Sequence, residues 1–431
     1  MIKIIKAGAG EFEKYFGELR QRGGVFTPEL LTSVVEIIQD VVVRGDEAVF
    51  QYTKQFDDYD LTAATMEATR AEIAEALACV SEEDMNVLRL AASRIEKYHR
   101  NQVVKGWAVA DEEGVELGQR ALPLRRVGIY APGGKACYPS TILMAAIPAQ
   151  LAGVEEIILV SPAKGGKLSP FIAAAAFVTG VKRIFKIGGA QAIAALAYGT
   201  NTVPYVDKIV GPGNAYVAAA KKLVFGQVDI DMIAGPSEVV IIADQTANPA
   251  FAAADLLAQA EHDEMAAAVL FTTDEKLAGD ISREIEKQLQ LLPKKDIAEK
   301  SLANYGAIVI TESIEQAIAL VNIFAPEHLE LMLAEPARYL LKIRNAGAVF
   351  LGHFTPEALG DYLAGTNHIL PTGGTARFSS PLGVYDFVKK MSVLSFSEEA
   401  LGKLSKDAIY FARMEGLDAH ANSVAVRKKE V

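Results

Sequence analysis

The sequence predicts an α/β protein with two Rossmann-like parallel-sheet domains, a small N-terminal arm and a C-terminal tail domain. Two observations support this fold class. From residue 126, short apolar strands are followed four times by turns and Ala-rich helices, and the strand pattern starts again at Glu238. Successive strand–turn–helix units form parallel sheets with helices on both faces. At 431 residues, the chain is also long enough for about two or three domains.

The composition is that of a well-folded protein, and the charge favours a small-molecule function. Hydrophobic residues make up 51% of the chain and charged residues 23%. The formal net charge of -11 argues against a nucleic-acid or anionic-membrane surface. Residues 1–6 lack the apolar core of a signal peptide, and no apolar run is long enough to cross a bilayer. With only Cys79 and Cys137, no disulfide framework is implied, so we expect a cytoplasmic protein.

The chain before residue 126 has the pattern of helices and one hairpin. Residues 1–24 predict a short strand and a helix, which we expect to form the N-terminal arm. Thr27-Pro28 and Ser81-Glu82-Glu83-Asp84 are helix starts. Residues 107–124 alternate on either side of Glu113-Gly114, which predicts a hairpin. We expect residues 25–125 to join residues 237–381 as one α/β domain.

Residues 126–236 predict the Rossmann-like domain. Its expected strands cover residues 126–130, 156–160, 183–187 and 208–210. Gly-rich turns follow three of these strands and present Tyr130, Gln191 and Asn214 at the carboxyl end of the sheet, where parallel α/β sheets bind ligands. These turns suit phosphate, but they are equally consistent with tight packing of helix against strand, since no Gly-x-Gly-x-x-Gly is present.

Residues 237–381 repeat the pattern, with expected strands at 238–243, 267–272, 307–310 and 348–351. A helix capped by Asn248 ends here in Gln259 and His262, which lie three residues apart and so can share one face. They form half of a metal site, or else a polar helix end at the surface. Residues 382–431 follow as the tail domain.

Three further polar clusters could carry chemistry. Glu327-His328 follows Pro326, and a helical turn there would keep His328 neutral as a base; a surface pair is the alternative. Asp361 and His368 are a candidate ligand and substrate contact, or a cap and a turn histidine. Glu415 and His420 supply a last carboxylate and imidazole. Cys137 could be a nucleophile, but the sequence shows no partnered base, which favours a packed residue.

Taken together, seven motifs resemble the histidinol dehydrogenase family, and they keep their order over nearly the whole chain. They are Val127–Gly134, Gly189–Ala192, Gly211–Asn214, Ala234–Glu238, Gln259–His262, Ala325–His328 and Glu415–His420. The resemblance implies a zinc- and NAD-dependent oxidation of L-histidinol through L-histidinaldehyde to L-histidine, the last step of histidine biosynthesis, with two NAD used per turnover. It also implies an intertwined homodimer in which the tail completes the neighbour's site.

The resemblance assigns roles residue by residue. The residues that match the zinc ligands are Gln259, His262, Asp361 and His420, and these are expected to surround the substrate as well. Glu327 and His328 match the acid–base pair, and His328 also faces the substrate. Ser237, His368 and Glu415 match substrate contacts, and Tyr130, Gln191 and Asn214 match NAD contacts.

Three other functions are compatible with parts of this pattern. A relative on the same scaffold could oxidise a different small alcohol. A zinc hydrolase could use Glu327 as its base and would turn over without nicotinamide. A two-lobed binding protein would carry out no chemistry.

Overall fold

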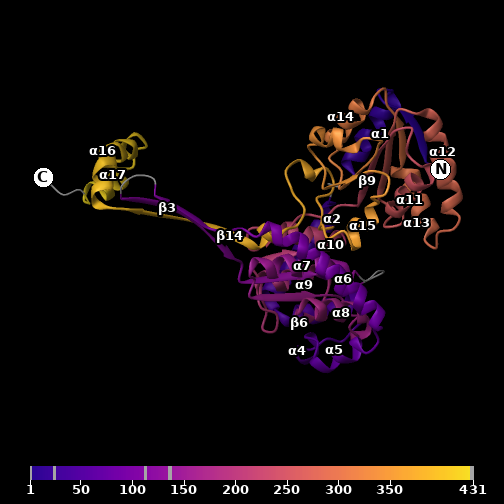
Figure 1. Cartoon of the computed structure of the whole chain (residues 1–431). Coiled ribbons are helices and arrows are strands. Elements are labelled where there is room, and N and C mark those ends of the chain that lie inside the picture. The colour runs from indigo at the N-terminus through magenta and orange to yellow at the C-terminus, as the bar shows by residue number, and fades with distance from the viewer. Residues whose placement is uncertain (1, 23–25, 111–113, 134–137, 428–431) are drawn as a thin grey trace.

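The computed structural model describes residues 2–22, 26–110, 114–133 and 138–427, which form two lobes and a long projecting ribbon (Figure 1). Each lobe contains one parallel sheet, of five and of six strands. We call them the five-stranded lobe and the six-stranded lobe. The predicted α/β class with two parallel-sheet units is therefore confirmed.

The sheet of the five-stranded lobe has the order β6-β5-β4-β7-β8, and all its pairs are parallel. Its strands are β4 Arg126–Tyr130, β5 Glu156–Val160, β6 Arg183–Phe185, β7 Lys208–Val210 and β8 Asp229–Ile230. The helices that connect them are α7 Pro139–Ala152, α8 Pro170–Thr179, α9 Gly189–Tyr198 and α10 Ala215–Val224. Strand order reverses between β4 and β7, which is the position where such sheets bind ligands.

The helices between residues 28 and 99 pack mainly on this lobe, so the expectation that they join residues 237–381 is wrong. They are α2 Pro28–Arg44, α3 Asp46–Asp57, α4 Ala63–Met66, α5 Arg70–Leu77 and α6 Glu82–His99. The apolar stripe of α2, with Val34 and Val41, shares a core with α9 and α10, while Ile95 of α6 shares one with α7 and α8. A helical stripe shows that a face is buried but does not identify the sheet that buries it.

The sheet of the six-stranded lobe has the order β1-β11-β10-β9-β12-β13 and is also parallel throughout. Its strands are β1 Lys3–Lys6, β9 Glu238–Ala243, β10 Ala267–Thr272, β11 Ala307–Ile310, β12 His328–Met332 and β13 Ala348–Leu351. One core lies under α11 Pro249–Ala260, α12 Glu275–Leu289 and α13 Lys295–Tyr305. A second lies under α1 Gly10–Gln21 and α14 Ile314–Phe324, and α15 Glu357–Tyr362 follows β13.

The expected N-terminal arm is built into this sheet. Strand β1 pairs with β11 from Lys3 opposite Ala307 to Lys6 opposite Ile310. Helix α1 buries Phe12 and Leu19 against the sheet. The short strand and helix were predicted, but pairing with a strand some 300 residues later leaves no mark in the local sequence.

The projecting ribbon consists of β2 Trp107–Ala110, β3 Val115–Pro123 and β14 Val388–Phe396. β2 and β3 form the predicted hairpin, and β14 pairs antiparallel with β3 along its whole length. The ribbon carries α16 Glu398–Met414 and α17 Asp418–Ala425 away from both lobes (Figure 1). Leu382 and Phe387 are still buried in the five-stranded lobe, so the tail leaves the body at about residue 388, later than expected. Within the described ranges, no helix is both long and apolar enough to cross a membrane.

Candidate active site

The predicted acid–base residues lie where β9 and β12 begin, at the amino edge of the six-stranded sheet. His328 is the first residue of β12 and pairs with Val239 of β9. The expected helical turn after Pro326 is therefore wrong, since the chain enters a strand there. Both Glu327 and His328 are buried, with 6% and 4% of their surface exposed, which excludes a surface pair.

His328 is held in one tautomer by the backbone. Its Nδ1 lies 3.1 Å from the carbonyl oxygen of Glu238. A carbonyl oxygen can only accept a hydrogen bond, so Nδ1 carries the proton and Nε2 carries the lone pair. Among the described residues, Nε2 has no hydrogen-bond partner. This nitrogen is thus the free basic atom of the site.

Burial keeps the His328 imidazole neutral. It lowers the pKa of His328 to about 3, and the neighbouring His262 and His368 act in the same direction. Carboxyl oxygens of Glu357 and Asp361 lie 3.5 and 3.8 Å from the ring nitrogens, and once ionised they would raise the pKa of His328. The imidazole is neutral as predicted, but desolvation causes this and not a helix N-terminus.

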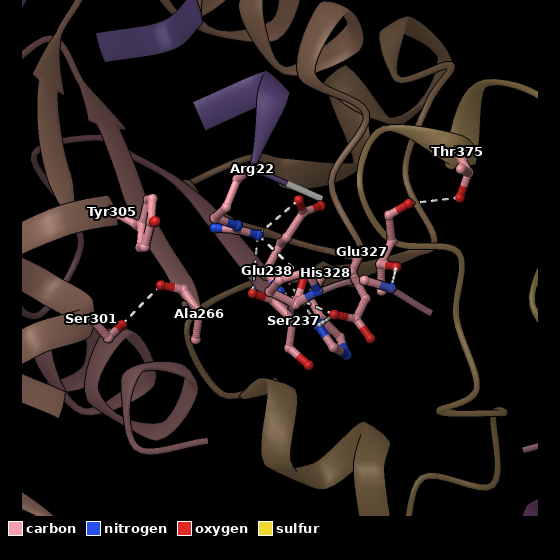
Figure 2. A network of polar contacts seen from close by, with 12 residues as sticks. Arg22, Ser237, Glu238, Ala266, Ser301, Tyr305, Glu327, His328 and Thr375 are labelled. Carbon is pink, nitrogen blue, oxygen red and sulfur yellow. Dashed lines mark hydrogen bonds and ion pairs between the residues drawn. The ribbon is translucent and has the colours of Figure 1, made fainter. Parts of the chain in front are cut away.

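Glu327 is tied to the same β9 peptide. Its Oε2 accepts a hydrogen bond of 3.0 Å from the backbone N–H of Glu238 (Figure 2). Burial raises the pKa of Glu327 well above its usual range, and the carboxyl groups of Glu238 and Asp361 add to this. The Glu238 N–H and the Arg22 guanidinium lower that pKa and so favour the ionised form.

Three side chains next to this pair could hold a metal ion. One ligand atom from each of His262, Glu357 and Asp361 lies within 4.8 Å of the other two. Glu357 and Asp361 are four residues apart on α15 and share one face, while His262 follows α11. Burial raises the pKa of Glu357 well above its usual range and that of Asp361 to about 6. A cation there would favour the ionised carboxylates and offset the free-energy cost of burying their charges.

Gln259 fits a role as a further ligand. Its side chain is fully buried, and in the described part of the chain neither atom of its amide has a hydrogen-bond partner. A buried polar group without a partner costs about 1–3 kcal/mol, so such a group indicates a missing ligand or water. The alternative that this helix ends in polar residues at the surface is wrong for Gln259, which is buried, although His262 is exposed.

The two other substrate-contact candidates of this lobe lie nearby. Ser237 is half-buried and directly precedes Glu238 on the approach to β9 (Figure 2). His368 is half-buried as well, and burial lowers its pKa to about 4, while a hydrogen bond that it donates to the backbone of Asp361 acts in the opposite direction. Glu415 and His420 lie on the tail at the end of the ribbon, so this chain does not bring them to its own site (Figure 1).

The three predicted cofactor contacts gather at the switch point of the five-stranded sheet. The hydroxyl of Tyr130 accepts a hydrogen bond of 3.2 Å from the N–H of Gly189. Gln191 is 1% exposed, and its amide has no partner among the residues that the structure places. Asn214 caps α10 by accepting from the N–H of Val217 at 3.1 Å. Packing requires Gly211, because a Cβ there would lie 2.2 Å from the Tyr130 carbonyl oxygen, so the tight-packing explanation applies to this turn.

A cavity of about 510 Å³ lies between the two lobes, beside His262. It is lined by Leu88 and Leu143 of the five-stranded lobe and by His262 and Tyr362 of the six-stranded lobe. Among the described residues, neither the acid–base pair nor the three predicted cofactor contacts line this cavity. Cys137, the candidate nucleophile, lies outside the described residues.

Sequence reasoning missed several buried acids of this site. Glu357 could have been found from its spacing of four residues before Asp361. Below it, Glu330 Oε1 accepts the N–H of Glu357 at 2.8 Å and so holds the start of α15. Burial raises the pKa of Glu330 well above its usual range and that of its neighbour Asp255 to about 6.

Comparison with known proteins places nearly the whole chain in one family. The family model described as histidinol dehydrogenase matches residues 20–428. A histidinol dehydrogenase of Syntrophotalea carbinolica is 53% identical over 430 residues and covers 100% of both chains. One from Geobacter sulfurreducens is 53% identical over 419 residues, covering 97% of this chain and 98% of the relative.

A solved structure leads to the same assignment. The crystal structure of histidinol dehydrogenase from Elizabethkingia anophelis superposes with a TM-score of 0.92 at 41% identity, covering 99% of this chain and 98% of the other. The chain belongs to the histidinol dehydrogenase family and is an oxidoreductase of histidine biosynthesis.

Proposed function

We propose that this protein oxidises L-histidinol through L-histidinaldehyde to L-histidine, using two NAD per turnover. The observation that carries the proposal is the environment of His328. A buried imidazole with a fixed tautomer lies with its Nδ1 3.8 Å from a carboxyl oxygen of the buried Glu327, and its Nε2, which has no hydrogen-bond partner among the described residues, lies 3.8 Å from Asp361, a candidate metal ligand. Alcohol oxidation by hydride transfer needs such a base together with a means of orienting the substrate.

We propose that a zinc ion is held by Gln259, His262 and Asp361 together with His420 of the partner subunit. The nitrogen and oxygen donors present here suit zinc, and the unpartnered amide of Gln259 and the close group of His262 and Asp361 support a cation at this place. When bound, zinc would supply coordination positions for the imidazole and amine nitrogens of histidinol, which fixes the alcohol carbon. Ser237 and His368 would add polar contacts to the same substrate, and so would the partner subunit's Glu415.

We propose that NAD binds at the switch point of the five-stranded sheet, against Tyr130, Gln191 and Asn214. One support is the buried amide of Gln191, which has no hydrogen-bond partner among the described residues. The other is the reversal of strand order beside Tyr130. When bound, NAD would supply the hydride acceptor of both oxidation steps.

The proton transfers follow from the two buried side chains. Nε2 of His328 takes the hydroxyl proton as the first hydride leaves the alcohol carbon, which becomes an aldehyde. Once ionised, which the Glu238 N–H and the Arg22 guanidinium favour, Glu327 takes a proton from water while the water oxygen adds to the aldehyde carbon. The proton then returns to the carbonyl oxygen to give the diol. His328, having lost its first proton to solvent, takes one from the diol as the second hydride leaves, and the product is a carboxylic acid.

The tail would reach this site in a homodimer. In the described chain, Leu404, Tyr410, Phe411 and Met414 are exposed on α16. An apolar helix face at the end of a long ribbon is typical of a surface that a second subunit covers. Exchange of the two tails would bring the partner subunit's Glu415 and His420 to the cavity between the lobes.

Half-reaction kinetics of Glu327→Gln test this assignment. The variant should oxidise L-histidinaldehyde far more slowly, because water activation needs the carboxylate, and should lose less of its alcohol oxidation, which depends on His328. Wild type should form two NADH per histidinol consumed and should contain zinc by elemental analysis. Equal losses in the two half-reactions, or turnover that needs no NAD, would contradict the proposal.

A further inference from the structure

A buried arginine lies behind the acid–base pair. Arg22 directly follows α1, and its side chain is 1% exposed. Its Nη2 donates to the carbonyl oxygens of Pro236 and Ser237 at 3.2 and 3.4 Å and to Oε1 of Glu238 at 3.0 Å (Figure 2). The guanidinium also lies 5.4 Å from the centre of the Tyr305 ring. One side chain of the N-terminal segment thus fixes three consecutive residues at the start of β9.

The last of these residues orients both members of the acid–base pair. The N–H of Glu238 donates to Oε2 of Glu327 at 3.0 Å, and its carbonyl oxygen accepts from Nδ1 of His328 at 3.1 Å. The side chain of Glu238 is 2% exposed and points to Arg22. A rotation of this residue would therefore move both contacts at once.

We propose that Arg22 is a positioning residue for the reaction, acting through Glu238 on Glu327 and His328. The inference rests on the acid–base roles given to those two residues under the proposed function. Arg22 does not line the cavity, and its bond to Ser237 is to the backbone carbonyl oxygen and not to the hydroxyl. Its effect should therefore fall on the rate of the proton steps and not on the binding of substrate or metal.

The pairing of Arg22 with Glu238 is buried and only partly satisfied. The side chains of Arg22 and Glu238 form an ion pair removed from water, which is costly unless the geometry is good and further hydrogen bonds are made. Nη2 makes the bonds to the carboxylate and the two carbonyl oxygens, while Nε and Nη1 have no hydrogen-bond partner among the described residues. A lysine ammonium could pair with Glu238 but offers a single charged centre on a flexible stem.

Steady-state kinetics of Arg22→Met and Arg22→Lys, with metal analysis, test the proposal. Misplacement of a catalytic group by about 1 Å costs about 100-fold, so we expect Arg22→Met to lower kcat by about 10- to 100-fold. The KM for L-histidinol and the zinc content should stay within about twofold of wild type, because Arg22 acts only through the β9 backbone. Arg22→Lys should recover part of kcat, and it keeps the test open if the Met variant does not fold. Exposed Arg20 of the same helix provides the matched control, and Arg20→Met should behave as wild type.

A double-mutant cycle separates positioning from a general loss of structure. On the alcohol half-reaction, Arg22→Met should cost less than about threefold in a His328→Asn background, since the group it positions is gone. A full, multiplicative loss in that background would overturn the inference, as would a kcat of wild-type size in Arg22→Met. If His328→Asn and Glu327→Gln themselves keep wild-type rates, the proposed function fails instead.

Discussion

Two buried glutamines allow the proposed ligand sites to be tested by stability. Gln259 and Gln191 are 0% and 1% exposed, and within the described chain neither amide has a hydrogen-bond partner. Such groups persist in a folded protein when a ligand uses them. We therefore predict that Gln259→Leu stabilises the metal-free protein and lowers its affinity for zinc.

The size of the effect follows from the burial. Each unsatisfied buried polar group costs about 1–3 kcal/mol, and leucine replaces the amide with an apolar group of similar size. With two orphaned atoms on one side chain, we expect a gain of about 1–3 kcal/mol in the metal-free free energy of unfolding, after allowing for imperfect packing. Loss of one ligand should weaken zinc binding by at least about 10- to 100-fold, the range measured for groups that only support a ligand.

Urea unfolding in the presence of a chelator, and zinc titration against a competing indicator, measure the two quantities. Gln191→Leu is the matched control, because it removes an equivalent orphaned amide from the other lobe. It should raise the metal-free unfolding midpoint of its lobe in the same way, leave zinc affinity unchanged and weaken NAD binding.

The reasoning would be refuted in two ways. A metal-free Gln259→Leu protein that is less stable than wild type would show that the amide is satisfied in the folded chain. Unchanged zinc affinity in a folded Gln259→Leu variant would remove Gln259 from the ligand set.

Three further predictions follow from the same structure. His328→Asn keeps a donor for the Glu238 carbonyl oxygen but lacks Nε2, so both half-reactions should fall by about 10²–10⁴-fold while the thermal midpoint changes little; a loss confined to one half-reaction would contradict the shared base. Phe411→Glu places a charge on the exposed apolar face of α16, so sedimentation should show dissociation to monomers, and a stable dimer would place the interface elsewhere. Burial raises the pKa of Asp255 to about 6, so the folded state binds the extra proton and stability falls as pH rises from the ordinary value of 3.8 through about 6. Asp255→Asn should remove that fall and gain stability relative to wild type across this window in urea unfolding, and parallel pH profiles of the two proteins would contradict it.

The sequence predicted most strands because they are apolar runs bounded by turn residues. The ranges expected for β4, β5, β7, β9, β10, β11 and β13 match the structure. β12 was missed, because Glu330 interrupts its apolar residues and Pro326 suggested a helix start. Glu330 is tolerated there only because it is 1% exposed, stays close to Asp255 and accepts the N–H of Glu357, a tertiary environment that local pattern does not show.

The same limit applies to the site. Gln259 and His262 could be paired from helical spacing, and Glu357 could have been added to Asp361 by the same rule. The contact between Arg22 and Glu238 spans 216 positions, so no local pattern connects them. The neutral state of His328 was predicted with the wrong cause, because burial within a strand depends on the packing of both faces of the sheet.

Subunit complementation tests the central claim most directly, namely that the tail of one subunit completes the site of the other. Subunits carrying His328→Asn and subunits carrying His420→Asn are each expected to be inactive alone. Mixed by co-expression, they should recover about a quarter of wild-type activity, since about half of the dimers are mixed and each mixed dimer has one intact site of two. No recovery, with mixed dimers shown to form, would contradict the account, because a tail that served its own subunit would leave every site defective.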